Sequence, residues 1–328
     1  MYHTSSKGKP PPDARDMLLT FAVAVREGKY GLGRQVKVQS VSKALRAVAQ
    51  KYVLDGHRDP RRSSHAQHSL DLPIAHLLKK FGDDDPPAEP KLAIPTSTVK
   101  KIAEQYIFSD HHRVVADLCI IAFFYLLRVG EYTTPKGKKK RRKRTIALRK
   151  CDIRLWCKGI LLHPAAELAT LLTADSGTIC IANTKNGTKG AVVHHEAIGG
   201  TLCPVAALAR RLHNIRQRPP TCPISTVVHR AKQPTRVSDR DITTAVRWGA
   251  TCDGLLNRGY STHRVSSHSL RAGGAMALKL AGESSDTIMR VGRWTSLTYM
   301  TYIHAQIGAL AKGLAWRMSK QYTFHNVG

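Results

Sequence analysis

The chain has few of the features that mark disulfide-bonded, zinc-binding or membrane-spanning proteins. Its seven cysteines are scattered and odd in number, and no two of them form a Cys-x-x-Cys pair. Neither a disulfide framework nor a zinc or other metal site is therefore expected. The protein is expected in a reducing compartment. The longest apolar run, from Val114 to Leu127, is interrupted by Asp117 and is too short to span a bilayer. No membrane partner and no secretory signal are expected.

Nucleotide-binding motifs are also missing. The sequence contains no Gly-x-x-x-x-Gly-Lys-Ser/Thr loop, and Gly28, Gly31 and Gly33 do not complete a dinucleotide fingerprint. We therefore expect no small-molecule cofactor and no chemistry driven by ATP.

Acidic residues are scarce. Asp and Glu number 23 against 52 Lys and Arg, which gives a formal net charge of +29 at pH 7 and a sequence pI near 10.2. This charge is far larger than solubility requires, so it predicts a polyanionic partner, DNA or RNA, bound with strong sensitivity to salt. The densest basic run, from Lys136 to Arg144, is typical of a solvated segment or a nuclear-import signal.

Residues suited to phosphate chemistry gather near the C-terminus. His268 and Arg271 are three residues apart and share one face of an expected helix, with Ser266-Ser267 as its N-cap. Trp294 supplies an indole N–H and Tyr302 a phenol. Such a combination is typical of chemistry on a phosphodiester.

Two further basic residues lie upstream. Arg128 follows the apolar run, and a guanidinium suits bidentate contact with phosphate. Lys185 precedes Asn186-Gly187 between two β-branched segments, which is a strong hairpin signal. A lysine at a hairpin tip can reach a scissile bond, and Lys189 on the same loop stays open as the alternative.

In the order Arg, Lys, His-x-x-Arg, Trp and Tyr, these residues resemble the tyrosine recombinase (phage integrase) family. The resemblance covers roughly residues 95–320 and includes the strings Leu-Arg-Val-Gly-Glu, Leu-Cys-Pro-Val and Gly-Arg-Trp. After Arg271 stands Ala-Gly-Gly-Ala rather than the His/Thr-rich continuation of bacterial members. This departure and the nuclear-import-like run look most like integrases of eukaryotic mobile elements, of the Crypton or DIRS-like types.

The resemblance implies DNA strand exchange through a covalent intermediate. By analogy, Tyr302 attacks a DNA phosphate to give a 3′-phosphotyrosine and releases a 5′-hydroxyl. Arg128 and Arg271 neutralise the charge that develops on the non-bridging oxygens, so no metal is required. Because an ordinary tyrosine has a pKa of about 10, the phenol needs this positive surrounding to become a nucleophile near neutrality.

The resemblance assigns the remaining roles residue by residue. Lys185 protonates the leaving 5′-oxygen, His268 takes part in proton transfer, and Trp294 donates its indole N–H to the phosphate while packing the site. Glu131, three residues after Arg128, orients its neighbours.

Double-stranded DNA is the partner that the resemblance implies, and the enzyme is expected to act as a homo-oligomer, tetrameric at synapsis. A nuclear location is expected for a eukaryotic element and a cytoplasmic one otherwise. The basic side chains expected to contact DNA from the first domain and the hairpin are Lys43, Arg46, Lys51, Arg58, Arg61, Arg62 and Lys189.

Simpler alternatives stay open. Tyr299 is a rival nucleophile one turn before Tyr302, although the interval after Trp294 favours Tyr302. Trp294 can be a packing residue, and His268 with Arg271 a surface pair. The alternative functions are a type IB topoisomerase and a DNA-binding protein that descends from a mobile element and does not cut. A basic RNA-binding protein would explain the charge but not the ordered residues.

The whole pattern predicts a mostly α protein with a small antiparallel β-sheet (α+β). Four segments are expected: a disordered basic, proline-rich start over 1–12, a helical core-binding, DNA-binding domain over 13–82, a linker over 83–95, and a tyrosine-recombinase catalytic domain over 96–328.

Local signals set the expected elements. Helices are expected to begin at Pro204 and at the capping box of Ser238, and strands to form the hairpin around Lys185. The histidine pairs at 111–112 and 194–195 are expected at the surface or facing DNA. The tail after Tyr302 is amphipathic and, by analogy, docks on a neighbouring protomer. Further helices are expected over 13–27, 40–54, 72–81, 99–108 and 114–128, and further strands near 145–148 and 159–162.

Overall fold

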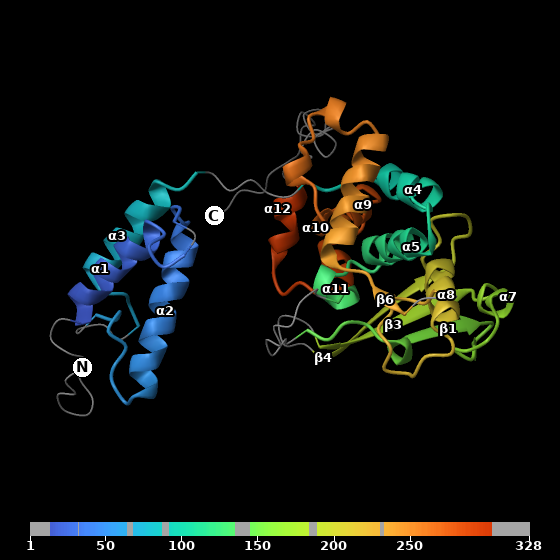
Figure 1. The fold of residues 1–328 in the computed structure, drawn as a ribbon, viewed down its shortest axis with the longest axis horizontal. Coiled ribbons are helices and arrows are strands. Elements are labelled where there is room, and N and C mark those ends of the chain that lie inside the picture. Colours follow the sequence, from blue (N-terminus) through green and yellow to red (C-terminus); the bar gives the residue numbers. More distant parts are fainter. Residues whose placement is uncertain are drawn as a thin grey trace, which may run out of the picture. The chain divides into compact units, whose positions relative to one another are not determined.

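The computed structural model describes residues 14–31, 33–63, 68–86, 92–134, 145–183, 189–229 and 233–303. The chain divides into two compact units, Met1–Ala88 and Glu89–Gly328 (Figure 1). Each unit has a hydrophobic core. No described helix is both long and apolar enough to cross a membrane. The predicted basic run 136–144, Lys185 and the tail 304–328 lie outside the described residues.

The first unit packs three amphipathic helices, α1 (Ala14–Arg26), α2 (Val38–Leu54) and α3 (Leu72–Asp83). Each helix presents one apolar stripe to the others, which buries Leu18, Val41, Leu45 and Ile74 almost completely. The predicted helices over 13–27, 40–54 and 72–81 are confirmed within two residues at each end.

An ion pair closes this unit. The buried Arg26 donates to the Val36 carbonyl at 2.6 Å and to the Asp85 carboxylate. Asp85 also accepts the backbone N–H of Val38 at 2.8 Å, at the start of α2. The Arg26 guanidinium, together with this N–H, holds the pKa of Asp85 below its ordinary value.

The second unit is built around one helix, α5 (Asp110–Phe124), which is buried from Val114 through Phe123. A helix that is apolar on all sides needs neighbours on all sides. The neighbours are α4 (Thr96–Gln105), α8 (Pro204–Asn214), α9 (Asp239–Cys252) and α10 (His268–Leu280) (Figure 1).

A four-stranded antiparallel sheet in the order β2-β1-β3-β4 lies beside α8 (Figure 1). Its strands are β1 (Ile153–Cys157), β2 (Ile160–Leu161), β3 (Ser176–Asn183) and β4 (Lys189–Glu196). Strand β3 alternates buried and half-buried residues, as expected where one face covers a core. A mostly α protein with a small antiparallel sheet was the prediction, and it is confirmed.

Short elements complete the second unit. The helical ones are α6 (Val129–Tyr132), α7 (Leu168–Leu171), α11 (Ser285–Gly292), α12 (Met300–Ile303) and the 3₁₀ turns Lys150–Asp152, Leu256–Arg258, Thr262–Arg264 and Leu297–Tyr299. A two-stranded ribbon pairs β5 (Thr226–Val227) with β6 (Thr235–Arg236).

Predictions made from local end signals are confirmed. Helix α8 begins with Pro204 at its first position. Ser238 and Asp241 form the capping box of α9: the Ser238 hydroxyl accepts the Asp241 N–H at 3.4 Å, and Asp241 accepts the Ser238 N–H at 2.7 Å. The hairpin strands pair antiparallel from Ser176–Glu196 to Asn183–Lys189.

Two predicted helix ends and one predicted strand are wrong. The helix expected over 99–108 ends at Gln105, because Ser109 caps α5 by accepting the His112 N–H at 3.3 Å. The helix expected to reach Arg128 ends at Phe124. Residues 145–148 form no strand: there the Leu148 N–H donates to the Glu131 carbonyl at 2.7 Å, and the sheet begins at Ile153 instead.

Candidate active site

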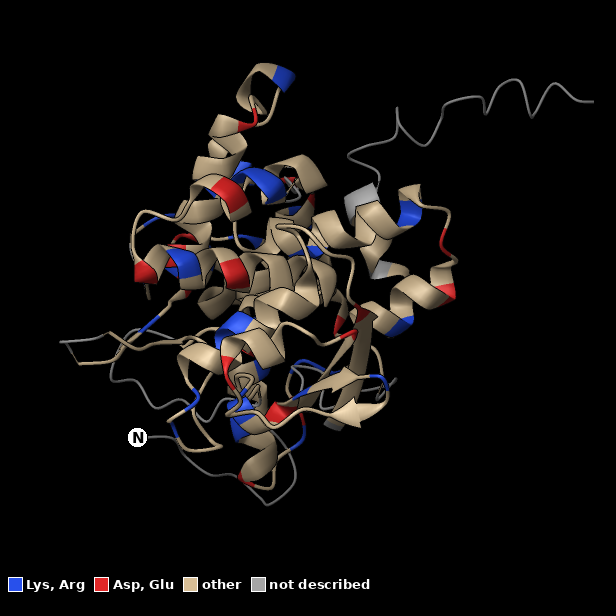
Figure 2. Ribbon diagram, turned by 90° about the vertical axis from the view of Figure 1, so that its right-hand side faces the viewer, with Lys and Arg blue, Asp and Glu red and all other residues tan. Residues whose placement is uncertain are grey.

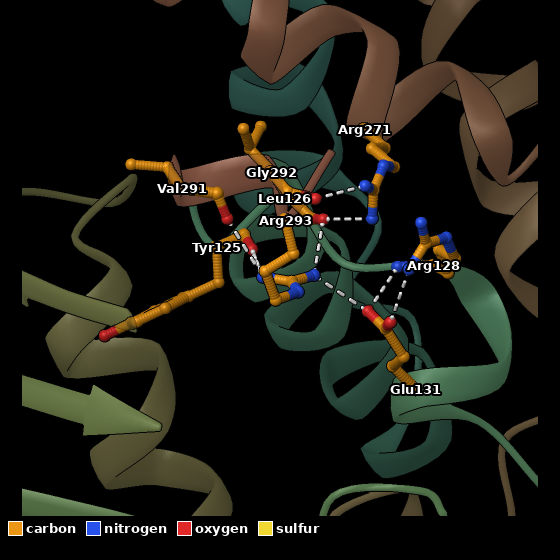
Figure 3. A network of polar contacts seen from close by, with 8 residues as sticks. All are labelled: Tyr125, Leu126, Arg128, Glu131, Arg271, Val291, Gly292 and Arg293. Atoms are coloured by element: carbon orange, nitrogen blue, oxygen red, sulfur yellow. Dashed lines mark hydrogen bonds and ion pairs between the residues drawn. The ribbon is translucent and has the colours of Figure 1, made fainter. Parts of the chain in front are cut away.

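The turn after α5 presents a backbone carbonyl to two arginines. Leu126 has a φ of +47°, a left-handed conformation that is uncommon for residues other than glycine. In this conformation the Leu126 carbonyl accepts hydrogen bonds from Arg271 Nη1 at 2.8 Å and from Arg293 Nη2 at 3.0 Å. The turn therefore brings together side chains from α10 and from the end of α11 (Figure 3).

Arg128 caps the short helix α6 and faces Glu131. Its backbone N–H donates to Glu131 Oε2 at 2.8 Å and its Nη1 to Glu131 Oε1 at 3.3 Å. The Glu131 side chain has no exposed surface, whereas that of Arg128 is 21% exposed. Arg128 is thus an anchored cation with one face open to solvent.

Arg271 lies deeper, one turn into α10, and is 1% exposed. Besides the Leu126 carbonyl, its guanidinium donates to the carbonyl of Gly292. The guanidinium carbon lies 4.3 Å from the centre of the Trp294 ring, a cation–π arrangement. Trp294 is half-buried, so the interpretation as a packing residue and the proposed contact with phosphate are compatible.

Glycine at 292 makes room for this stack. A Cβ there would lie 1.8 Å from Cζ3 of Trp294, far inside van der Waals contact. The Trp294 backbone N–H donates to the Met289 carbonyl at 3.0 Å, which fixes the turn that follows α11. The Gly-Arg-Trp string therefore has a local steric reason for its glycine.

Arg293 is the member of the cluster that sequence reasoning missed. It lies in the Gly-Arg-Trp string that resembles the recombinase family, but the sequence predicted no role for it. Its side chain is 6% exposed and donates to Glu131 Oε2 at 2.9 Å, and its Nη1 donates to the carbonyls of Tyr125 at 3.2 Å and Val291 at 3.0 Å. Burial lowers its pKa, and the Glu131 carboxylate opposes that shift.

No protein-family model and no curated protein matches this chain. Solved structures do. The XerH site-specific recombinase bound to a palindromic difH substrate, in a post-cleavage complex, is 15% identical with a TM-score of 0.54; the match covers 92% of this chain and 72% of that one. The chain has the tyrosine-recombinase fold.

Two other solved recombinases also match. The Tn1549 transposon integrase in complex with circular intermediate DNA is 13% identical, with a TM-score of 0.49 and coverage of 92% of this chain and 87% of that one. The XerA recombinase is 14% identical, with a TM-score of 0.41 and coverage of 95% and 94%.

On this recombinase fold, the two candidate tyrosines lie in consecutive short elements. Tyr299 is fully buried, its hydroxyl donates to Ser285 Oγ at 2.7 Å, and its ring centre lies 5.7 Å from that of Trp294. These contacts are those of a core residue. Tyr302 has its backbone in α12, and its side chain lies outside the described residues.

His268 is the first residue of α10 and is exposed, in contrast to the buried Arg271 three residues later. The N-cap was predicted at Ser266-Ser267; the structure places Ser267 at that position without a capping hydrogen bond, while the Ser266 hydroxyl accepts the His268 N–H at 3.4 Å. His268 thus marks the surface end of the helix that carries Arg271.

The structure corrects the surface interpretation for His195, whereas His194 is exposed. Because a carbonyl only accepts, His195 Nε2 donates to the Phe124 carbonyl, at 2.9 Å, and the ring packs edge-on against Tyr125 at 4.7 Å. Burial lowers the pKa of His195. His111 and His112 are half-buried, and His112 packs edge-on against Tyr106 at 4.8 Å.

The basic residues predicted to contact DNA differ in their local contacts. Lys43, Arg46 and Lys51 are exposed on α2, and Lys51 pairs with Asp55 at 2.5 Å. The half-buried Arg58 donates to the carbonyl of Ser63. Lys189 begins β4, and its side chain lies outside the described residues.

Three of these arginines, Arg46, Arg61 and Arg62, line one hollow of about 340 Å³ in the first unit. Arg61 is held by Asp59 at 2.7 Å, and Arg62 donates to the His68 carbonyl at 2.5 Å. Lys and Arg also occur on many other elements (Figure 2). Among the described residues, no group of three or more His, Cys, Asp or Glu is placed to hold a metal ion.

Proposed function

We propose that this protein is a DNA strand-exchange enzyme, a site-specific recombinase or integrase of a mobile element. The observation that carries the proposal is the convergence of Arg128, Arg271 and Trp294 from distant parts of the chain around Glu131 and the Leu126 carbonyl. The net charge of +29 supports a nucleic-acid partner, and the recombinase fold supports DNA.

The proposed reaction conserves the phosphodiester bond energy. The Tyr302 oxygen attacks the phosphorus, the P–O5′ bond breaks, and a 3′-phosphotyrosine and a 5′-oxygen result. The phenol proton leaves through a base, for which the exposed His268 is the candidate. The 5′-oxygen takes a proton from Lys185 or Lys189. A 5′-hydroxyl of another strand then gives its proton to the neutral lysine and attacks the phosphorus, the bond between phosphorus and the Tyr302 oxygen breaks, and His268 returns the proton to that oxygen.

The two arginines contribute differently to this reaction. Arg128, with its open face, is suited to direct contact with a non-bridging oxygen. Arg271 is buried, so its charge acts through a medium of low dielectric constant, where electrostatic stabilisation is strong. Both charges also favour the ionised phenol.

Double-stranded DNA is the proposed partner, in a homo-oligomer that is tetrameric at synapsis. The mobile-element assignment, of the Crypton or DIRS-like kind and hence nuclear, rests on the sequence resemblance. The side chains proposed to contact DNA outside the active site are Lys43, Arg46, Lys51, Arg58, Arg61, Arg62 and Lys189.

The test is covalent capture. The protein is incubated with a library of nicked suicide duplexes with randomised flanks, and complexes that survive denaturation are sequenced. We expect wild type to form adducts and Tyr302→Phe to form none. Tyr299→Phe is the matched control: it loses the hydroxyl contact with Ser285 and keeps the adduct.

The other functions appear as separate outcomes. An adduct that forms with Tyr302→Phe contradicts the proposal. DNA binding by wild type without any adduct supports the non-cutting alternative. Adducts without sequence preference, together with relaxation of supercoiled plasmid, support the type IB topoisomerase.

A further inference from the structure

Arg293 has a backbone conformation that is unfavourable for a residue with a side chain. It follows α11 with φ +55° and ψ +44°, the left-handed conformation that glycine adopts without strain. For other L-residues this conformation costs about 1–2 kcal/mol. A strained, buried arginine persists where the surrounding contacts over-determine it, and such positions cluster at functional sites.

The first link runs from Arg293 to Arg128 through Glu131. Glu131 Oε2 accepts from Arg293 Nη2 at 2.9 Å and from the Arg128 backbone N–H at 2.8 Å, whereas Oε1 accepts from the Arg128 guanidinium at 3.3 Å. Arg293 therefore fixes the plane of the carboxylate, and the carboxylate fixes Arg128. It also shares the negative charge, which weakens the pull of Glu131 on Arg128.

The second link runs from Arg293 to Arg271 through the Leu126 carbonyl. A carbonyl oxygen has two lone pairs, and here it accepts from both arginines at 2.8 and 3.0 Å. Arg293 also donates to the preceding carbonyl, that of Tyr125, at 3.2 Å. Two anchors on consecutive carbonyls hold the left-handed turn in the orientation that Arg271 needs (Figure 3).

We propose that Arg293 is a positioning residue that couples Arg128 and Arg271 into one phosphate-binding unit. It acts through Glu131 and the Leu126 carbonyl, because its two Nη nitrogens donate to these two groups and to the Tyr125 and Val291 carbonyls, and its side chain is 6% exposed. This role needs the forked shape of the guanidinium as well as its charge, since the Arg293 guanidinium donates to one carboxylate and three carbonyls at once. The inference rests on the proposed function for its catalytic consequence, but the coupling itself does not.

Arg293→Lys keeps a positive charge for Glu131 and loses the fork. We expect the single-turnover rate of adduct formation to fall about 10- to 100-fold at saturating DNA, because small misplacements of catalytic groups cost that much. DNA affinity should stay within about twofold, since Arg293 is buried. A purely structural role would lower the melting temperature and leave the rate of the folded fraction unchanged, and that result overturns the inference.

A double-mutant cycle tests the coupling without any catalysis. In Arg293→Gln, the Glu131 carboxylate keeps the guanidinium of Arg128 as its ion-pair partner and loses that of Arg293. Arg128→Ala should therefore destabilise this background more than it destabilises wild type. Arg210→Gln is the matched control, because it breaks a separate ion pair with Asp117 on α5. Its loss of stability and that of Arg293→Gln should be additive. Additive effects in the Arg128 cycle overturn the inference.

The two failures are distinguishable. Absence of an adduct in wild type refutes the proposed function alone, because the cycle still reports whether Arg293 and Arg128 are coupled. A normal adduct rate in folded Arg293→Lys refutes the inference alone. If Arg293→Gln does not fold, the cycle is run in the Arg293→Lys background, where non-additivity with Arg128→Ala again supports the coupling and additivity refutes it.

Discussion

Gly274 holds α10 against the end of α5, and the substitution Gly274→Ala tests how closely the two must approach. A Cβ at this position would lie 2.2 Å from the Phe123 carbonyl oxygen and 2.4 Å from Leu126 Cδ2. Ordinary contact begins at 3.4 Å, so the helix must retreat by roughly 1 Å. The obstacle is backbone, which cannot rotate aside as a side chain can.

Two opposing terms decide the sign of the stability change. Glycine inside a helix costs about 0.5–1 kcal/mol relative to alanine, so propensity alone favours the substitution. Overpacking of a well-filled core costs about 1–3 kcal/mol. We expect a net loss of about 1–2 kcal/mol, or a fall in melting temperature of roughly 2–8 °C for a unit of this size. Arg271, on the same helix, should move away from the Leu126 carbonyl, and adduct formation should slow by about 100-fold.

The assay is thermal unfolding followed by tryptophan fluorescence. All four tryptophans lie between residues 156 and 316, so the signal reports on the second unit. Gly130→Ala is the matched control, because a Cβ there would meet nothing within 4 Å although Arg128 is two residues away. A Gly274→Ala protein as stable and as active as Gly130→Ala would refute the close-approach argument.

Three further predictions concern charge. Burial holds the pKa of His195 in the folded protein below its ordinary value of 6.5. The neutral imidazole therefore contributes its full stabilisation above pH 6.5, and this stabilisation is lost as the pH falls through the folded pKa. In His195→Asn, the urea midpoint should therefore decline less between pH 7 and pH 5 than in wild type. Arg210→Gln leaves the Asp117 carboxylate buried and unpaired, so chemical denaturation at pH 7 should show a loss of about 3–5 kcal/mol. Burial raises the pKa of Asp117, so this carboxyl takes up a proton at a higher pH than an ordinary aspartate does. A protonated carboxyl carries no charge that needs an arginine, so the stability lost in Arg210→Gln should become smaller towards pH 4. Arg46→Gln should lower the slope of log affinity for duplex DNA against log salt by about one, as binding titrations at several salt concentrations would show.

Features with short-range signals were predictable from the sequence. Pro204 and the Ser238–Asp241 box mark helix starts because caps act within one turn, and Asn186-Gly187 marks the hairpin because the strands that it joins are adjacent in the chain. Arg128, Arg271 and Trp294 were named from their order along the chain, and the structure brings them together.

Features set by distant contacts were not predictable. The end of α5 was placed too late because no glycine or asparagine marks the left-handed turn, which is instead formed by Leu126. Arg293 acts on Leu126 and Glu131 across 167 and 162 residues, and no local pattern encodes such a pairing. Gly273 and Gly274 looked like a departure from the family pattern, yet a Cβ at either lies 2.2 Å from a carbonyl oxygen of another segment.

The balance of charge in the cluster connects this architecture with the proposed chemistry. In the contacts described, three guanidiniums meet one carboxylate, that of Glu131. Backbone carbonyls of Leu126, Gly292 and Tyr125 stabilise the buried cations, but dipoles do not cancel their charge. Among these four described groups the formal charges sum to a surplus of about two positive charges, held by anchors that need not rearrange during the reaction. A phosphodiester carries one negative charge and its pentavalent transition state about two, so the fixed surplus matches the transition state better than the ground state, which is the condition for electrostatic catalysis.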